Sequence, residues 1–169
     1  MKRLLALIAF VMAAITPSFG QTMTNEAHRN ANREKVLSGA ACTGCDLFQL
    51  DFSYKEITNR DFSGSRLRQA DFSVSTMDGS RFAHANLSIL EAYGARFSKA
   101  DFSGADLSEA SFVGAWLGGA NLTGANLTAA NFSGAYLKTA RGLTQVQLNK
   151  ACGDSETEVP AGLRMPVCK

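Results

Sequence analysis

The residues of this chain whose types and spacing could do chemistry are two cysteines and two histidines. Cys42 and Cys45 have the C-x-x-C spacing of thiol redox motifs. Such motifs work in thioredoxin-like settings, which the regular repeat that begins at Cys45 excludes. His28 and His84 are fifty-six residues apart, and neither belongs to a metal-ligand spacing. The sequence therefore predicts no catalytic residue, no metal and no cofactor, and a protein that is not an enzyme.

The segment that must position any functional side chain is a five-residue repeat. It runs from Cys45 to Thr139 without an insertion and comprises nineteen pentads. The central residue is Leu or Phe in sixteen of them, and the residue two positions earlier is Ala, Ser or Cys in fifteen. A period of five fits neither an α-helix nor a β-strand. It indicates a solenoid in which each unit buries its apolar residue against its neighbours.

The central residues show how many pentads form one coil. Like residues recur every twenty positions, whereas a spacing of fifteen mixes them, so we expect four pentads per coil, with coils about 4.8 Å apart. Where Ala92 replaces a central Phe, Leu90 takes the preceding small position, which conserves interior volume. Lys55 and Arg60 stand at inward positions of the first coil, so we expect local distortion there, with both charges reaching solvent. Two of the columns are Leu47, Leu67, Leu87, Leu107, Leu127 and Phe52, Phe72, Ala92, Phe112, Phe132.

The pentads resemble those of the pentapeptide-repeat family, whose pattern is A-(D/N)-(L/F)-x-x. Residues 100–104 read Ala-Asp-Phe-Ser-Gly and residues 120–124 read Ala-Asn-Leu-Thr-Gly, and the resemblance spans 45–139. It implies an all-β fold, the right-handed quadrilateral parallel β-helix of that family. The best-known role of the family is binding DNA gyrase with an acidic rod that imitates duplex DNA. This chain departs from that pattern, because its repeat has eight basic and ten acidic residues.

The N-terminal residues 1–20 have the features of a signal peptide. Lys2 and Arg3 precede an apolar stretch from Leu4 to Ile15, and 17–20 is a plausible cleavage region. The stretch is too short for a membrane span. Removing these residues leaves fifteen basic and fifteen acidic residues, a balance that argues against a nucleic-acid partner. We expect an exported protein, periplasmic or extracellular, without a membrane span.

The segments on either side of the repeat should cap its ends. Residues 21–44 form the front cap, where Asn25 to Leu37 tolerates a helix and offers Val36 and Leu37 to the first coil. Residues 140–169 form the rear cap. There Thr144 and Gln147 have capping-box spacing, which predicts a short helix through about Ala151 that presents three apolar residues to the last coil: Leu143, Val146 and Leu148.

The cysteines can form two disulfides in an exported protein. The solenoid holds Cys42 and Cys45 far from Cys152 and Cys168, so only the pairs Cys42–Cys45 and Cys152–Cys168 satisfy the distance limit of about 7 Å between Cα atoms. For Cys45 an alternative stays open, because a free thiol also fits the inward column of small residues.

The outward surface has one anomaly. Trp116 and Tyr136 are twenty residues apart at outward positions where the family pattern has Asp or Asn. Tyr93 and Val113 stack in the same way on the neighbouring face, near the same corner. Aromatic residues often anchor protein interfaces, so these four residues are a candidate partner site. Scattered surface aromatics, or a cap segment folded over them, would also explain the pattern.

We therefore expect an exported, non-enzymatic scaffold whose rod presents a surface to another protein, which includes a second copy of itself. The alternative is a DNA-mimicking protein that binds gyrase in the cytoplasm.

Overall fold

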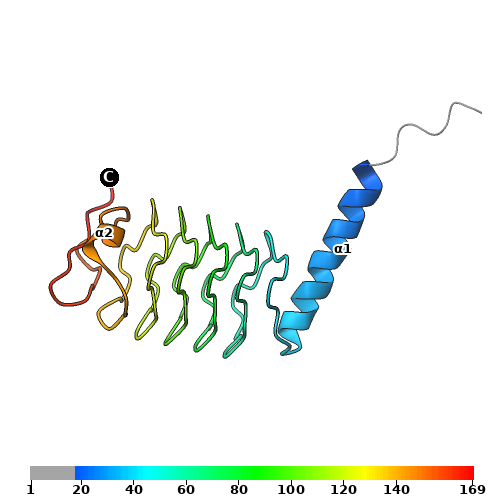
Figure 1. The fold of residues 1–169 in the computed structure, drawn as a ribbon, viewed down its shortest axis with the longest axis horizontal. Helices are drawn as coiled ribbons and strands as arrows, with labels where there is room; N and C mark the ends of the chain where they lie inside the picture. Colours follow the sequence, from blue (N-terminus) through cyan, green and yellow to red (C-terminus); the bar gives the residue numbers. More distant parts are fainter. Residues whose placement is uncertain (1–17) are drawn as a thin grey trace, which may run out of the picture.

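The computed structural model describes residues 18–169. The predicted signal peptide therefore lies outside the described residues, except for its last three positions. In Figure 1 a stack of coils forms a rod, with helix α1 (Ser18–Leu37) at one end and the short helix α2 (Gln145–Leu148) at the other. Within 18–169, neither helix has the length and the apolar character needed to cross a membrane.

Each coil of the rod takes twenty residues and has four sides. Successive coils are joined by parallel bridges between residues twenty apart, as between Asp51 and Asp71. The N–H groups of the central residues other than Leu127 donate to the next coil or to the rear cap, as from Leu67 to the carbonyl of Asn86 at 2.7 Å. This is a β-helical solenoid with four pentads per coil, as the columns predict. We call one side the Trp116 face, and its bridged residues are Glu56, Thr76, Arg96, Trp116, Tyr136 and Glu158.

The interior is filled by the central residues of the pentads, each at most 3% exposed. The rings of Phe82 stack on those of Phe62 and Phe102, with centroids 5.0 Å apart in each pair. Leu90 and Ala92 are both fully buried, which confirms that large and small side chains have exchanged places in this pentad.

The corners of the coil are tight turns with one residue in the left-handed region. Glycine occupies this position at Gly104 (φ +63) and Gly124 (φ +66), as the sequence predicts. Non-glycine residues adopt the same conformation elsewhere. They include the β-branched Val74 and Ile89, both with φ +57, for which this conformation is strained.

Where Asp or Asn precedes the central residue, its side chain caps the following turn. The Oδ1 of Asp51 accepts a hydrogen bond from the Ser53 N–H at 2.8 Å, and that of Asn131 accepts from Ser133 at 2.9 Å. This contact satisfies a backbone donor that the bridges leave free. It gives the outward Asp and Asn of the repeat a structural role beyond solubility.

The front end of the rod has the distortion expected at Lys55 and Arg60. Lys55 reaches solvent as expected, but Arg60 does so only in part, because it is half-buried and its Nε is buried without a hydrogen-bond partner. The Arg60 N–H donates to the hydroxyl of Ser80, and that hydroxyl donates to the carbonyl of Ile57, at 3.1 Å each. A serine hydroxyl from the next coil thus bridges the two ends of this turn.

Helix α1 caps the first coil with polar groups more than with apolar ones. Asn32 and Arg33 donate to the carbonyls of Asp46 and Asp51, at 3.2 Å each. Val36 is buried as expected, but Leu37 is 36% exposed. The expectation of short helical caps is wrong at this end, because α1 has 20 residues and begins seven residues before Asn25.

The rear cap has the predicted capping box between Thr144 and Gln147. Helix α2 ends at Leu148 rather than near Ala151, because the carbonyl of Lys150 is recruited by the N–H of Ala129 in the last coil, at 2.7 Å. Leu148 is buried, and Leu143 packs against the core. The expectation for Val146 is wrong. Its side chain is 69% exposed, because this four-residue helix turns its other side to the rod.

Candidate functional site

The most distinctive surface feature is an aromatic pair on the Trp116 face. The rings of Trp116 and Tyr136 are stacked, with centroids 4.0 Å apart and planes 2° from parallel. A parallel bridge joins the two residues in neighbouring coils. Trp116 is 45% exposed and Tyr136 is half-buried. The fold therefore holds two aromatic side chains rigidly together at the surface.

The pair occupies positions that elsewhere cap a turn. In other columns Asp101 and Asn126 accept hydrogen bonds from the N–H groups two residues later, at 3.0 and 3.2 Å. An indole has no acceptor atom, and a phenol carries its oxygen at the far end of the ring, too far to take the place of that carboxylate or amide oxygen. The fold therefore gains no turn cap from either aromatic residue.

Gly118 makes room for the indole ring of Trp116. A Cβ atom at this position would lie 2.6 Å from the indole Nε1 and 3.0 Å from Cε2. Any larger residue would displace the ring. The sequence offers a weak signal for this contact, because Gly118 stands at the first turn position, where Thr, Asp, Ser or Lys stands in the other coils of this face.

Two ion pairs flank the aromatic pair, one at each end. Arg96 lies 2.7 Å from Asp78, and Lys138 lies 3.0 Å from Glu158. Hydrogen bonding and attraction to Glu158 raise the pKa of Lys138 above its ordinary value. The carboxylate of Asp78 also accepts the N–H of Ser98 at 2.9 Å. The aromatic pair thus lies between two ion pairs, each neutral as a whole, which sequence reasoning did not find.

The other two predicted site residues lie on the corner before this face. Tyr93 is 59% exposed and Val113 is half-buried. The N–H of Gly94 donates to the carbonyl of Val113 at 2.9 Å, so the two residues belong to neighbouring coils. Tyr54 and Val74 are left-handed turn residues of the first two coils, outside these two rows, and are 77% and 47% exposed. The four predicted residues thus form two adjoining rows.

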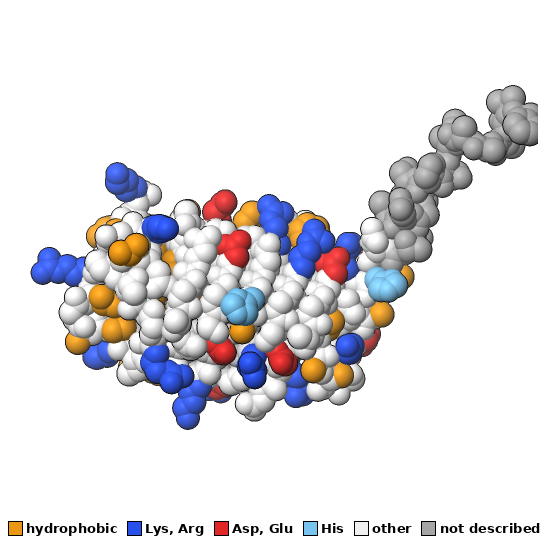
Figure 2. Space-filling model, viewed as in Figure 1, with side chains coloured by type: hydrophobic (Ala, Val, Ile, Leu, Met, Phe, Trp, Pro, Cys, Tyr) orange, Lys and Arg blue, Asp and Glu red, His pale blue; other side chains and the backbone are white. Residues whose placement is uncertain are grey.

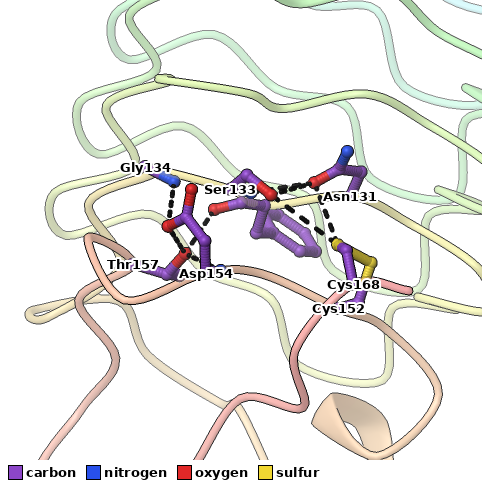
Figure 3. The surroundings of a disulfide bond; sticks show 8 residues. Asn131, Ser133, Gly134, Cys152, Asp154, Thr157 and Cys168 are labelled. Carbon is purple, nitrogen blue, oxygen red and sulfur yellow. Dashed lines mark hydrogen bonds between the residues drawn. A yellow bond between two sulfur atoms is a disulfide. The ribbon is translucent and has the colours of Figure 1, made fainter.

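The cysteines form two disulfides, Cys42–Cys45 and Cys152–Cys168. Cys45 is 8% exposed and keeps its inward position, so the bonded state and the inward column are compatible. Figure 3 shows Cys168 beside the last coil, where its sulfur lies 3.4 Å from Oδ1 of Asn131.

Asp154 holds the same segment from the other side. Its carboxylate accepts the N–H of Gly134 at 2.8 Å, and this bond lowers the pKa of Asp154. The disulfide and the carboxylate together fasten the C-terminal segment to the rod.

The charged side chains of the rod are mixed rather than separated. On the face seen in Figure 2, basic and acidic side chains alternate with uncharged ones. Bridges place Arg81 between Asp61 and Asp101, and hydrogen bonds from Ser63 lower the pKa of Asp61. One row is acidic in its first three members, because Asp71 bridges both Asp51 and Glu91. In the part of the chain that the structure describes, no group of three metal-ligating residues gathers.

Comparisons with known proteins agree with the repeat. The family model described as pentapeptide repeats (8 copies) matches residues 59–88, 92–124 and 105–141. A search of the curated proteins finds no match.

Solved structures of similar proteins include three from different sources. HetL of the cyanobacterium Nostoc sp. strain PCC 7120, involved in heterocyst differentiation regulation, is 24% identical over 70% of this chain and 55% of its own, with a TM-score of 0.40. This chain thus spans about half of HetL. A pentapeptide repeat protein of the Arabidopsis thaliana thylakoid lumen is 32% identical over 72% of this chain and 83% of its own (TM-score 0.31). QnrB1, a plasmid-mediated fluoroquinolone resistance protein, is 19% identical over 75% and 79% (TM-score 0.32). With its uninterrupted pentads and its match to the family model, the chain belongs to the pentapeptide-repeat family.

Proposed function

We propose that this protein is an exported, non-enzymatic scaffold that binds a protein partner through the Trp116 face. The observation that carries the proposal is the stacked pair of Trp116 and Tyr136, held at the surface in positions where the fold gains no turn cap from them. Rigid aromatic side chains lose little conformational entropy on binding and supply large contact areas. A β-helix that presents such a pair suits recognition rather than catalysis.

Two features support export. Residues 1–20 have the composition of a signal peptide, and the chain forms two disulfides, which persist in oxidising compartments. We propose that residues 21–44 and 140–169 are the caps of a mature protein whose repeat is residues 45–139. We also propose that the coil is right-handed, as the family implies. Fractionation of the native source would test export, since a cytoplasmic pool with an intact leader would contradict it.

The binding role is tested by a pull-down from the exported fraction with the purified mature protein as bait. We expect Trp116→Asn and Tyr136→Asn each to weaken partner capture by about 10-fold or more, because aromatic anchors often contribute over 2 kcal/mol to binding. Both variants should keep their free energy of unfolding within about 1 kcal/mol, because asparagine can cap the turn.

Tyr54→Asn is the matched control. It removes a more exposed aromatic residue from the first coil, at φ +57, where asparagine is well tolerated. We expect Tyr54→Asn to retain full partner capture. Equal capture by the wild type and the Trp116→Asn variant would refute the proposed site.

One observation favours the gyrase-binding alternative, namely the acidic row of Asp51, Asp71 and Glu91. An acidic row could stand in for the phosphates of one DNA strand. A gyrase supercoiling assay with the mature protein decides between the two roles. The alternative would be supported if the mature protein inhibits supercoiling, if Asp71→Lys abolishes that inhibition, and if Trp116→Asn leaves it unchanged.

A further inference from the structure

We infer that the partner on the Trp116 face is a second copy of this chain, packed antiparallel about a two-fold axis that passes between the levels of Trp116 and Tyr136. The inference rests on the proposed function, because it names the occupant of the same site. It follows from the order of charges along two neighbouring rows.

The first row is the line of bridged residues on the face itself. In order along the rod it reads Arg96, Trp116, Tyr136, Glu158. A positive charge therefore stands one coil before the aromatic pair, and a negative charge stands one coil after it. The side chain of Arg96 and that of Glu158 are 55% and 50% exposed, so both can make contacts outside their own molecule.

The second row runs along the adjoining corner, and its charges have the opposite order. Asp78 reaches forward to the level of Arg96, where its two oxygens meet the Arg96 guanidinium and the Ser98 N–H. Lys138 reaches forward to the level of Glu158, 3.0 Å from its carboxylate. Negative charge thus precedes the aromatic pair in this row, and positive charge follows it.

One possible two-fold axis lies in the plane of the face and runs perpendicular to the rod. It makes the second molecule run in the opposite direction, and it places each row of one molecule against the same row of the other. Arg96 then faces Glu158 of the second copy, and Asp78 faces Lys138 of the second copy. Every charge meets an opposite charge, and each contact occurs twice. A two-fold axis parallel to the rod would instead oppose Arg96 to itself and Glu158 to itself, which is unfavourable. The charge pattern therefore selects the antiparallel pair.

The centre of this interface is apolar, and the two copies can come close to each other there. Trp116 lies opposite Tyr136 of the second copy, and Gly118 lies opposite Lys138 of the second copy. Because Gly118 has no side chain, the stem of that lysine can pass beside the indole. Exposed aromatic residues surrounded by a rim of charges are the usual anatomy of a specific interface.

The face is only one side of a narrow rod, so the area that it buries lies below the roughly 1,200–2,000 Å² of a standard interface. We therefore expect a reversible dimer whose population rises with concentration and falls with salt, as charge-dependent association does.

Sedimentation velocity of the full mature protein, over a concentration series, tests the inference. We expect the wild type to shift from monomer to dimer. Arg96→Glu and Glu158→Arg alone should each raise the dimer dissociation constant about 10-fold or more, because each places like charges opposite one another at both ends of the interface. An equimolar mixture of these two variants should recover the dimer, because each then meets the opposite charge of the other. Circular dichroism checks that each variant is folded.

The mixture separates this inference from the proposed function. Two monomeric variants whose mixture stays monomeric, or a wild type that is monomeric throughout, would overturn the inference. If the monomeric protein still captures another protein in a Trp116-dependent way, the proposed function stands without the dimer. If Trp116→Asn changes neither self-association nor capture, both fail.

Discussion

Single outward residues of this protein divide into those that serve the coil and those that do not. Asp51 and Asp61 cap their turns through the N–H groups of Ser53 and Ser63, at 2.8 and 2.9 Å. Trp116 and Tyr136 stand in the equivalent positions of another column and are stacked on each other instead. Outward residues that do not stabilise the coil are candidates for a functional role, because functional positions often carry a cost in stability.

The capping carboxylates should make stability sensitive to acid. Hydrogen bonds from Ser53 and Ser63 lower the pKa of Asp51 and of Asp61 below the ordinary value of 3.8. The folded state therefore binds protons less readily than the unfolded chain. The stabilisation is present above this value and is lost as the pH falls through the lower folded pKa. We expect the thermal midpoint, followed by circular dichroism, to fall steeply below about pH 4.

The double variant Asp51→Asn/Asp61→Asn is the control, because asparagine keeps the capping oxygen but does not titrate. Its thermal midpoint at neutral pH should stay close to that of the wild type, and its loss in acid should be shallower. An equally steep loss would show that these caps do not link stability to pH.

At the scale of the pentad, the backbone conformation of the turn and the space around it determine which residue type each corner accepts. The same left-handed conformation recurs at most corners of the repeat and again at Gly142, just after the repeat, yet the space around it differs. At Gly142 (φ +74) an added Cβ would lie 2.7 Å from the Thr123 nitrogen and 2.8 Å from its Cα, whereas at Gly124 (φ +66) nothing lies within 4 Å. The first position needs glycine for conformation and for space, and the second for conformation alone.

Alanine substitutions at these two glycines should separate the two demands. We expect Gly124→Ala to cost about 1 kcal/mol, the strain of a left-handed alanine. Gly142→Ala should cost about 1–3 kcal/mol more, because backbone atoms of Thr123 must move. Urea unfolding followed by circular dichroism measures both. Similar midpoints for the two variants would mean that the turn at Gly142 yields without cost.

At the scale of the whole molecule, the rod depends on how its ends are closed. Coils in the middle pair with a neighbour on both sides, but the terminal coils have only one. At the rear, Cys152 and Glu158 extend the pairing beyond the last full coil, through bridges to Asn131 and Tyr136. At the front, α1 supplies side-chain donors, and Lys55 occupies an edge position where a charge discourages pairing with another chain.

Removal of each disulfide should show how much each end depends on its covalent closure. Cys152 and Cys168 are 16 residues apart, and Cys42 and Cys45 are 3 apart. In the chain-entropy model we expect Cys152→Ala/Cys168→Ala to cost about 3 kcal/mol and Cys42→Ala/Cys45→Ala about 2 kcal/mol. Thermal unfolding by calorimetry measures the difference. A larger loss at the front would show that the buried Cys42–Cys45 pair contributes mainly through packing.

The interior of the rod could be predicted from the sequence because its constraint repeats. Every coil buries side chains at equivalent inward positions, which recur every twenty residues. Comparison of the residues at these positions therefore reveals the length of the coil and the exchange of large and small side chains at Leu90 and Ala92. The ends and the surface follow no such repeat. The length of α1 and the exposure of Val146 depend on which residues reach the terminal coils. The Arg96–Asp78 pair joins residues 18 apart through side-chain geometry, which no column of identical residues reveals.

The coil length also limits how this chain can change in size. Each coil takes twenty residues on four sides, so gaining or losing a single pentad would rotate everything after it by a quarter turn. If the change fell between Arg96 and Trp116, the aromatic pair would leave the side that carries Arg96, and the two rows of charge would no longer run together. Duplication or deletion of a complete circuit would preserve every vertical alignment. Evolutionary lengthening of such a rod is therefore expected to proceed in whole circuits wherever its outer surface is under selection.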